Sequence, residues 1–377
     1  SVVKEMRSAR LRFGTRAVAP MWANQSKLPR LPLPALEDTL TRYLAATKPL
    51  VSTAQHARTA QLVSTELEDG SLLSRLQGTL AAAEATRSEP SFVARAWDAM
   101  YLAGRWPLAV NSNPGVVNFA DAFGEDATTQ VQRAARMVAV AAAFARRVEA
   151  GTLSPDSFKG VPTDMRQYVH MFSSTRLPRR GCDVLRKAAD HAVGRHIVVL
   201  RRSYLWSVPI VDPVRRPLSV AALEVALEHV CVESDRLSAV AAGNGAAGGH
   251  AAPPPLAALT TLDRDAWADA RAALEAHSGA NVASLGIVDD SLFALCLDAA
   301  AAGELDDGMV EDAVRLSLCG DSSLAPRWHD KSLTFMVSSV RQATFDPVRP
   351  TPSAPPRPPH PIRPTRTSTP SSTSSST

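Results

Sequence analysis

Two β-rich segments follow one another in the middle of the chain, and they constrain the fold more than any other feature of the sequence. HIVVLRR begins at His196 and YLWSVPIV ends at Val211, and both are rich in β-branched and aromatic residues. Because the two runs stand only about a turn apart, the region from Arg195 to Val211 is predicted to form a pair of strands. Strands set among helical segments indicate a body of mixed helix and strand.

Helical patterns surround the strand pair. Helices are predicted at Leu36–Leu50, between Val51 and Glu89, and at Ser91–Leu102, Thr128–Ala150, Ser219–Val240, Leu262–Ala276 and Ser291–Ala301. Two further short apolar runs, Trp106–Asn111 and Ser332–Val337, are predicted to be strands. The segment Pro29–Pro34 is predicted to be extended, because proline fixes φ and keeps the preceding residue out of the helical region.

The composition of the chain changes near both ends. Residues 1–25 are rich in arginine, and we expect either a segment like a mitochondrial transit peptide or a disordered basic arm. Residues 26–337 are the predicted folded region, with an exposed insertion near 243–255 whose Gly, Ala and Pro residues cannot bury much surface. Residues 338–377 contain ten prolines from Pro347 onward and end in a Ser/Thr run, which predicts a disordered tail.

Charge and cysteine content argue against several classes of protein. The net charge of +4 arises largely at the two ends, so the folded body gives no argument for a nucleic-acid partner. The four cysteines, Cys182, Cys231, Cys296 and Cys319, follow no metal-ligand or disulfide spacing, which predicts no metal site and a reducing compartment. The sequence contains no run of 18 apolar residues, so membrane association is not supported.

Residues suited to acid–base chemistry are few. The sequence contains no GxSxG, GxxxxGK[ST], GxGxxG or HExxH motif. By residue type alone, His191 and His196 are each either a general base or a structural histidine. His229 lies between Glu228 and Glu233, which suits a general base and equally a simple pair of helical residues one turn apart. None of these histidines is assigned a catalytic role.

Arginine pairs and aromatic residues offer two kinds of binding surface. Arg201–Arg202 and Arg215–Arg216 can hold phosphate oxygens with their guanidinium groups, or they can be solvated surface charges. Trp97, Tyr101 and Trp106 can form the wall of a pocket for a cationic ligand through cation–π contacts, or they can pack in the core. Composition and spacing leave both uses open.

Five motifs occur in order along the chain. They are LPRLPLPALEDTLTRYL (28–44), WDAMYLAGRWPLAVNSNPGV (97–116), MFSSTRLPRRGCD with RHIVVLRRSYLWSVPIVD (171–183 and 195–212), LTTLDRDAWADAR (259–271) and RWHDKSL (327–333). Together they resemble the choline/carnitine acyltransferase family, with Leu33 where a smaller or β-branched residue is usual. The resemblance covers about residues 26–337.

The resemblance implies both a fold and an activity. The fold is an α/β structure with a mixed sheet and packed helices, similar to the chloramphenicol-acetyltransferase-like N-terminal domain of carnitine acyltransferases. The activity is transfer of an acyl group between coenzyme A and carnitine or choline, with the coenzyme A thioester as co-substrate and no bound cofactor or metal. By the same resemblance, Trp97 and Tyr101 line the substrate passage, although Trp97 alone stands for the family's tryptophan pair, one place out of register.

No catalytic residue is assigned in this chain. In the family, RWxDKSL leads through a short apolar strand and a turn to a Glu-His pair, whose histidine is the general base. Here the match is expected to end at Val337, because residues 338–341 do not continue the strand and turn, and no Glu-His pair follows. The Glu228–His229 pair lies well before Arg327 and cannot replace it. We therefore expect the N-terminal half of the family fold, truncated before the general base.

Two alternatives to an active enzyme stay open. One is a catalytically inactive family member that acts as a binding module, since the tail contains PSAP and PPRP segments suited to partners that bind polyproline helices. The other is the product of a gene model that leaves the reading frame near Val337. The mitochondrion is the expected location, with the peroxisome and the cytoplasm as alternatives. Acyl-coenzyme A and carnitine or choline are the expected partners of the intact enzyme.

Overall fold

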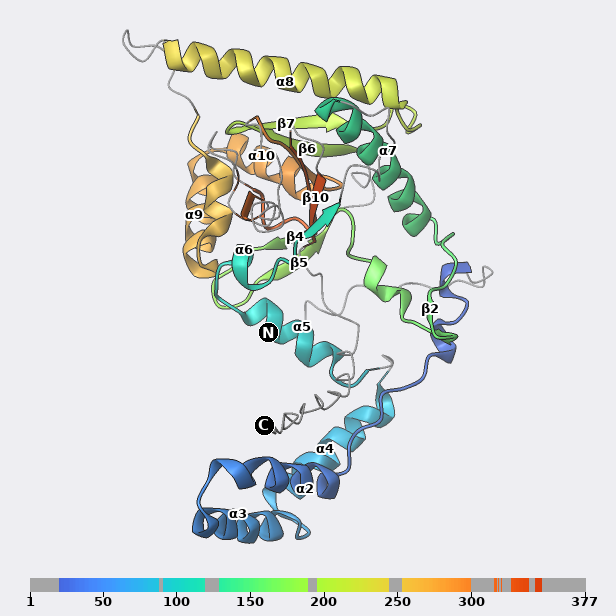
Figure 1. Cartoon of the computed structure of the whole chain (residues 1–377), viewed down its shortest axis with the longest axis vertical. Helices are drawn as coiled ribbons and strands as arrows, with labels where there is room; N and C mark the ends of the chain where they lie inside the picture. The colour runs from blue at the N-terminus through green and yellow to red at the C-terminus, as the bar shows by residue number, and fades with distance from the viewer. Residues whose placement is uncertain are drawn as a thin grey trace, which may run out of the picture.

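A six-stranded mixed sheet forms the centre of the molecule (Figure 1). The computed structural model describes residues 20–87, 91–118, 129–188, 195–243, 253–299, 315–316, 318, 320, 327–338 and 343–347. The strands of the sheet are β1 (Val116–Asn118), β6 (His196–Arg201), β7 (Tyr204–Pro209), β8 (Ala294–Leu297), β9 (Leu333–Val337) and β10 (Ala343–Pro347), in the order β1-β10-β9-β8-β6-β7. The central strands β6, β8 and β9 are parallel, whereas the pairs β1–β10, β10–β9 and β6–β7 are antiparallel.

Helices and two small hairpins complete the described structure. The α-helices are α2 (Leu36–Thr47), α3 (Thr53–Glu66), α4 (Leu72–Thr86), α5 (Ala94–Ala103), α6 (Leu108–Asn111), α7 (Gln130–Glu149), α8 (Val220–Gly243), α9 (Arg264–His277) and α10 (Gly279–Asp290). The 3₁₀ helices are η1 (Pro20–Trp22), η2 (Gln25–Lys27), η3 (Lys48–Leu50), η5 (Met165–Tyr168) and η7 (Leu256–Thr261). The hairpins are β2 (Ser157–Phe158) with β3 (Val161–Pro162), and β4 (Ser174–Leu177) with β5 (Val184–Lys187). The predicted α/β class, a mixed sheet with packed helices, is confirmed, while the likeness to a chloramphenicol-acetyltransferase-like domain stays a prediction.

The strand pair predicted from the β-rich segments is confirmed as the β6–β7 hairpin. Its register pairs His196 with Pro209 and Arg201 with Tyr204. The connection is a two-residue turn in which Arg202 has φ 46°, because the turns that match the twist of a hairpin require left-handed backbone. The hairpin forms one edge of the sheet.

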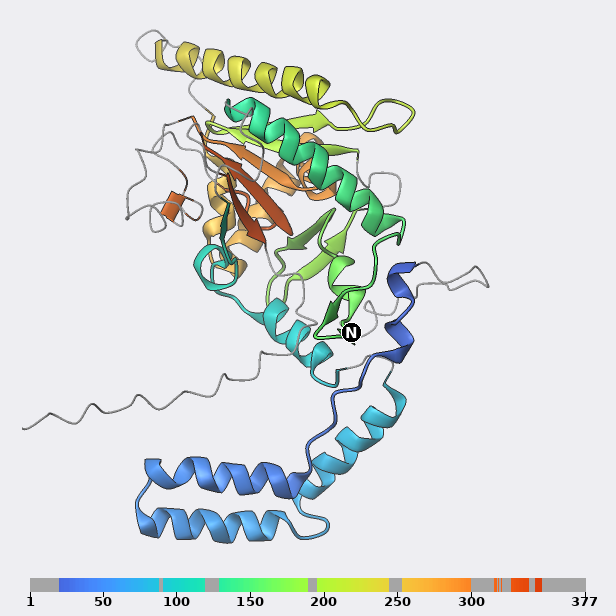
Figure 2. The same ribbon diagram turned by 45° about the vertical axis from the view of Figure 1, so that its right-hand side comes forward.

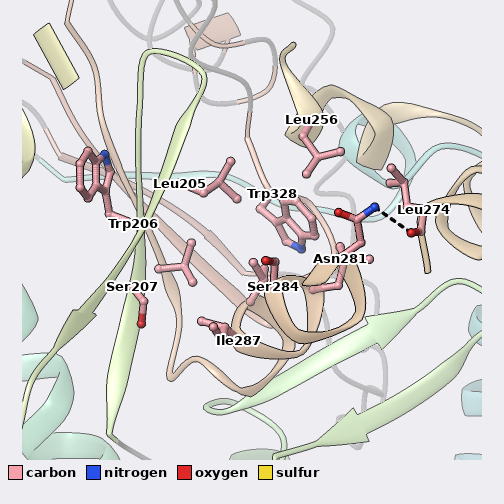
Figure 3. Close-up of a pocket in the computed structure, with 12 residues that line it drawn as sticks. Leu205, Trp206, Ser207, Leu256, Leu274, Asn281, Ser284, Ile287 and Trp328 are labelled. Carbon is pink, nitrogen blue, oxygen red and sulfur yellow. Dashed lines mark hydrogen bonds between the residues drawn. The ribbon is translucent and has the colours of Figure 1, made fainter. Parts of the chain in front are cut away.

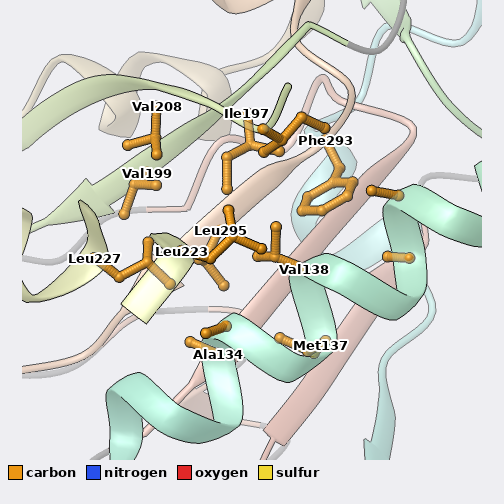
Figure 4. Close-up of a cluster of buried hydrophobic side chains, with 14 of the residues drawn as sticks. Ala134, Met137, Val138, Ile197, Val199, Val208, Leu223, Leu227, Phe293 and Leu295 are labelled. Atoms are coloured by element: carbon orange, nitrogen blue, oxygen red, sulfur yellow. The ribbon is translucent and has the colours of Figure 1, made fainter. Parts of the chain in front are cut away.

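Alternate residues of β6 face two different layers of helices, as the two-residue period of a strand requires. Ile197 and Val199 belong to a buried cluster formed with α7 and α8, shown in Figure 4. Val198 and Leu200 belong to a second cluster formed with α9 and α10. The sheet is therefore covered on both faces, which explains why its central strands are apolar without interruption.

Helix α7 shows how local signals place a core helix. A capping box joins Thr129 and Gln132 at its N-terminus, which satisfies two backbone N–H groups that have no partner inside the helix. Small residues such as Ala134 and Ala141 form its buried face and allow close approach to the sheet. Gly151, with φ 66°, follows its end and supplies the left-handed residue that commonly stops a helix. The predicted helix at Thr128–Ala150 is confirmed.

Helices α2, α3 and α4 form an arm that extends away from the layered body (Figures 1 and 2). Ser52 and Gln55 form a capping box at the start of α3. Leu40 and Val63 are the buried apolar residues of α2 and α3, whereas α4 has no buried residue. Several leucines of the arm are strongly exposed; examples are Leu50 (80%), Leu62 (62%), Leu72 (60%), Leu76 (49%) and Leu80 (49%). The amphipathic spacing was predicted correctly, but the described residues leave the apolar side of α4 largely in solvent.

The strand predicted at Trp106–Asn111 is wrong. The segment forms α6, a single helical turn with Leu108 and Ala109 buried, and the backbone N–H groups of Ser112 and Asn113 both donate to the carbonyl of Leu108. A short apolar run gives no period by which a strand can be told from a buried helical turn.

The helix predicted at Ser291–Ala301 is also wrong, because its centre forms β8. All four residues of Ala294–Leu297 are buried, and the strand runs parallel to β6 on one side and β9 on the other. A strand that is covered on both faces is apolar at every position and lacks the alternation that identifies strands. The helix that precedes it, α10, was not predicted.

Ordered structure continues past the expected end of the folded region. β9 was predicted correctly at Ser332–Val337, but the chain then reverses, and β10 pairs antiparallel with β9 so that Ala343 lies opposite Val337. These strand residues fall within 338–377, the range predicted as a disordered tail. Residues 1–19, 244–252 and 348–377 lie outside the described residues. Within the described part of the chain, no helix has the length and apolar character needed to cross a membrane.

Candidate functional site

Asp183 lies at the centre of a buried group of charged side chains. It ends the loop between β4 and β5 and is 2% exposed. Its carboxylate accepts hydrogen bonds from Arg176 Nε and from Arg264 Nε, both at 2.7 Å, and Arg105 Nη2 lies 2.9 Å from it. Three guanidinium groups therefore converge on one carboxylate. A further carboxylate is needed to compensate their positive charge.

Asp330 supplies a second buried carboxylate. It accepts a hydrogen bond from Arg264 Nη1 at 2.6 Å and another from Trp267 Nε1 at 2.7 Å. Burial disfavours the charged form of Arg264, but the Asp330 and Asp183 carboxylates outweigh burial and hold the pKa of that guanidinium above its ordinary value. We call Arg105, Arg176, Asp183, Arg264 and Asp330 the buried charge network.

The buried charge network joins four of the five sequence motifs, those at 97–116, 171–183, 259–271 and 327–333. Sequence reasoning did not select its residues. Charged side chains are mostly exposed, and Arg264 is 81 residues from Asp183 and 66 residues from Asp330 in the sequence. No local pattern marks such partners.

The buried charge network holds the C-terminal end of α5. Arg176 Nη2 donates to the carbonyl oxygen of Tyr101 at 2.6 Å, and Arg105 Nη2 donates to that of Leu102 at 2.8 Å. The backbone N–H of Asp183 also donates to the Leu102 carbonyl, at 2.9 Å. Because the last carbonyl groups of a helix have no partner inside it, these donors fix the position of α5 against β4 and β5.

Helix α5 carries both residues that were predicted to line the substrate passage. Trp97 and Tyr101 lie one helical turn apart, with ring centroids 5.4 Å from each other and ring planes inclined by 39°. Both side chains are partly buried, and Trp97 Nε1 is buried with no hydrogen-bond partner among the described residues. The structure brings these two residues together as an aromatic pair, and their role in a passage stays a prediction.

A carboxylate follows the aromatic pair along the same helix. Asp98 is half-buried, and this burial raises its pKa to about 6, while Arg166 acts in the opposite direction. At neutral pH the carboxyl group of Asp98 is therefore ionised in most protein molecules. An ionised carboxylate on the helix that carries the aromatic pair favours a cationic ligand over an anionic one.

The third aromatic candidate, Trp106, lies elsewhere. It is 44% exposed, and its ring packs against Gly104, where a Cβ atom would lie 2.6 Å from the ring. Trp106 therefore neither joins the aromatic pair nor enters the core.

The histidines considered as general bases make contacts that suit a structural role. His229 is exposed on α8 and lies edge-on to Trp206, while the neighbouring Glu233 pairs with Arg236 at 2.5 Å. His196 Nε2 lies 2.8 Å from the carbonyl oxygen of Ile287. His191 lies outside the described residues. Among the residues that the structure describes, no cluster of His, Cys, Asp and Glu has the arrangement of a metal site.

The arginine pairs do not form a phosphate site in the described structure. Arg201 and Arg202 both bind the carboxylate of Asp235, at 2.7 and 2.5 Å. Arg215 and Arg216 lie in the turn after β7, where the backbone N–H of Arg216 donates to Asp212 at 2.7 Å. Both arginines of the first pair are therefore already engaged by the carboxylate of Asp235, and the second pair belongs to a local turn.

The buried Lys331 leads to a prediction about how folding stability depends on pH. It is fully buried, and its Nζ donates to the carbonyl oxygens of Asp289 at 2.8 Å and Ser291 at 2.7 Å. Burial lowers the pKa of this ammonium group from 10.5 to about 7. Between pH 7 and 10.5 the unfolded chain binds a proton that the folded chain has lost, so folding stability is expected to rise with pH in this window, by about 1 kcal/mol per pH unit.

Urea unfolding at pH 7, 8.5 and 10 measures this dependence. Lys331→Met is expected to remove the rise, because it removes the titrating group. The difference in slope between the wild-type chain and this variant isolates Lys331 from other groups that titrate in the same range. Equal slopes for the two proteins would contradict the prediction.

The chain is similar to known proteins over most of its length. A family model described as choline/carnitine O-acyltransferase matches residues 31–345. Among curated proteins, mitochondrial carnitine O-palmitoyltransferase 2 of Bos taurus is 32% identical over 86% of this chain and 49% of its own length. Choline O-acetyltransferase of Rattus norvegicus is 32% identical over 82% of this chain and 47% of its own.

A third relative, from Saccharomyces cerevisiae, is named a putative mitochondrial carnitine O-acetyltransferase, and it is 30% identical over 85% of this chain and 47% of its own length. The chain thus spans about half the length of the curated relatives that it matches. The family match also ends at residue 345, so the expected end of the resemblance at Val337 lies eight residues too early. The sheet of this chain also continues beyond Val337, since β10 pairs with β9.

Proposed function

The chain belongs to the choline/carnitine O-acyltransferase family, and from this premise we propose that it forms the acceptor-binding half of an enzyme that moves an acyl group between coenzyme A and carnitine or choline. The observation that carries the proposal is the aromatic pair Trp97 and Tyr101, held on α5 by the buried charge network. The named relatives include carnitine and choline acyltransferases. The mitochondrion is the proposed location, since two of these relatives are named as mitochondrial.

Carnitine and choline, the acceptors in the names of these relatives, each carry a quaternary ammonium group. Such a group has no N–H to donate, so it cannot be bound by hydrogen bonds, and the negative face of an aromatic ring is its usual partner. Two inclined rings at 5.4 Å offer adjoining faces to one cation. The half-buried carboxylate of Asp98 adds a compensating charge on the same helix.

The proposed reaction is direct transfer between the two substrates. A general base takes the proton of the acceptor hydroxyl, and the alkoxide oxygen attacks the thioester carbonyl carbon. The carbonyl electrons move to oxygen and return when the C–S bond breaks, so the acyl group ends on the acceptor and the coenzyme A thiolate leaves and takes a proton. In this reaction α5 orients the acceptor. The general base and the hydrogen-bond donors that stabilise the oxyanion come from other segments.

Binding of choline tests this proposal. Trp97→Leu is expected to weaken choline binding by about 5-fold to 30-fold, which corresponds to roughly 1–2 kcal/mol for a partly buried cation–π contact. Tyr101→Phe keeps a ring and is expected to bind as the wild-type chain does, whereas Tyr101→Leu should lose affinity. Titration calorimetry or ligand-observed NMR gives the dissociation constants.

Two controls make the result specific. The uncharged analogue 3,3-dimethyl-1-butanol has the shape of choline without its charge, and it is expected to bind at least 5-fold more weakly if the contact is cation–π. Trp106→Leu removes an exposed tryptophan that lies outside the aromatic pair and should leave choline binding unchanged. Equal binding of choline by wild-type chain and Trp97→Leu would overturn the proposal.

A further inference from the structure

A cavity of about 210 Å³ lies on the side of the sheet that α9 and α10 cover (Figure 3). Leu205 of β7, Leu256 of η7 and Leu274 of α9 form apolar walls, and Trp328 forms the floor. Asn281 and Ser284 of α10 bring polar groups to the same space. The cavity is open on one side, where Ser207, Ser284 and Ile287 are exposed, so a ligand can enter it from solvent.

The residues that line the cavity include no Asp, Glu, Lys, Arg or His. A charged molecule would lose its hydration there without gaining an opposite charge, which is strongly unfavourable. The lining is also mainly aliphatic and aromatic, as in sites for small organic molecules. The chemistry of the walls therefore favours a neutral, largely apolar ligand.

The volume limits the size of the ligand. An apolar cavity of about 150 Å³ accepts benzene, whereas pockets for drug-sized molecules begin near 300 Å³. The 210 Å³ cavity lies between these values, and it suits a molecule with roughly eight to ten non-hydrogen atoms.

The polar groups of the cavity suit a ligand with one hydroxyl group. Asn281 donates through Nδ2 to the carbonyl oxygen of Leu274 at 2.8 Å, and Figure 3 shows its carboxamide oxygen on the side of Trp328. Trp328 Nε1 is buried with no hydrogen-bond partner among the described residues, and it points toward Ser284 and Asn281 in the same view. The carboxamide oxygen of Asn281 can accept a hydrogen bond from a ligand hydroxyl, whereas Trp328 is fully buried and contributes only apolar surface to the cavity.

We propose that this cavity is a binding site for a neutral aliphatic alcohol of medium chain length. The alkyl chain lies between Leu205, Leu256 and Leu274, and the hydroxyl lies at the Asn281 end. The inference rests on the shape and lining of the cavity and is independent of the aromatic pair on α5, which shares no residue with it.

Binding of 1-heptanol to the full chain tests this site. Saturation-transfer NMR and tryptophan fluorescence are expected to show saturable binding, since the ring of Trp328 lines the cavity. Heptanoate, which carries a charge at pH 7, is expected to bind at least 10-fold more weakly. The ether 1-methoxyhexane accepts but cannot donate a hydrogen bond, and it should bind more weakly than the alcohol.

A matched pair of variants on α10 locates the site. Ser284 is exposed at the rim of the cavity, and Ser284→Phe is expected to fill the entrance and weaken 1-heptanol binding at least 10-fold. Val282 is 50% exposed on the same helix and does not line the cavity, so Val282→Phe should bind as the wild-type chain does. Circular dichroism of both variants checks the fold, and Ser284→Leu repeats the test if the larger ring disturbs it.

The proposal is overturned by any of three results. These are no saturable binding of 1-heptanol to the wild-type chain, binding of heptanoate as tight as that of the alcohol, or unchanged alcohol binding in a folded Ser284→Phe variant.

Discussion

Asp183→Ala is expected to lower the free energy of unfolding by about 3–5 kcal/mol, because it removes the carboxylate partner of the buried Arg176 and one of the two carboxylate partners of Arg264 and of Arg105. The carboxylate is 2.7 Å from both Arg176 and Arg264 and is almost fully shielded from water. A loss of this size is a large part of the 5–15 kcal/mol that stabilises a typical domain. A strongly reduced melting temperature or a loss of soluble protein is the expected result.

The exposed pair Arg180–Asp269 provides the control for Asp183→Ala. Its side chains are 73% and 50% exposed, and solvent-exposed ion pairs contribute about 0–1 kcal/mol. Asp269→Ala is therefore expected to leave the urea midpoint nearly unchanged. If Asp183→Ala unfolds within 1 kcal/mol of the wild-type chain in the same experiment, the buried charge network is not a major source of stability.

Asp183→Asn removes the negative charge of the side chain but keeps its shape. The amide keeps the volume and one oxygen acceptor, so most of the packing is retained. We expect a loss close to that of Asp183→Ala, because both variants remove the one negative charge that the three arginines share. The same variant is expected to weaken choline binding, since Arg176 and Asp183 hold the carbonyl end of the helix that carries Trp97 and Tyr101.

The second large effect concerns activity. The 377-residue chain is expected to show no transfer of an acyl group from acetyl- or palmitoyl-coenzyme A to carnitine or choline above the uncatalysed rate. The family resemblance places the general base in a Glu-His pair after a strand and turn that follow RWxDKSL. The corresponding strand here is β9, and no Glu-His pair follows it in the sequence. A positioned general base alone contributes about 10²-fold to 10⁴-fold.

Release of free thiol and mass spectrometry of the acylated acceptor measure this activity. A full-length carnitine acyltransferase serves as the positive control, and choline binding by the chain shows that the protein is folded. His229→Ala should change nothing, because His229 is exposed on α8 beside Trp206. Turnover that this substitution abolishes would contradict the prediction and identify His229 as the base.

Some elements were predictable because their signals are local. Helix α7 has its capping box, its stripe of small residues and its terminal glycine within about 20 consecutive positions. The β6–β7 hairpin was predictable for the same reason, since two β-rich runs lie beside one another in the sequence. Trp97 and Tyr101 are four residues apart in a predicted helix, and this spacing alone places their rings on one face.

Other features depend on contacts between distant segments. Ala294–Leu297 has no period of its own, and it is a strand because β6 and β9 pair with it on both sides. Asp183, Arg264 and Asp330 resemble surface charges until folding brings three segments together. The cavity beside Trp328 exists only where β7, η7, α9 and α10 meet.

The sequence by itself determined the mixed α/β class, the family resemblance and the aromatic pair, because each depends on residue types at short, fixed spacing. Only the tertiary structure decided that the charges of four motifs form one buried network, that β10 continues the sheet beyond Val337, and that a neutral cavity lies under α10. These features arise from pairing between segments tens to hundreds of residues apart, and a one-dimensional pattern carries no information about which charge or strand meets which.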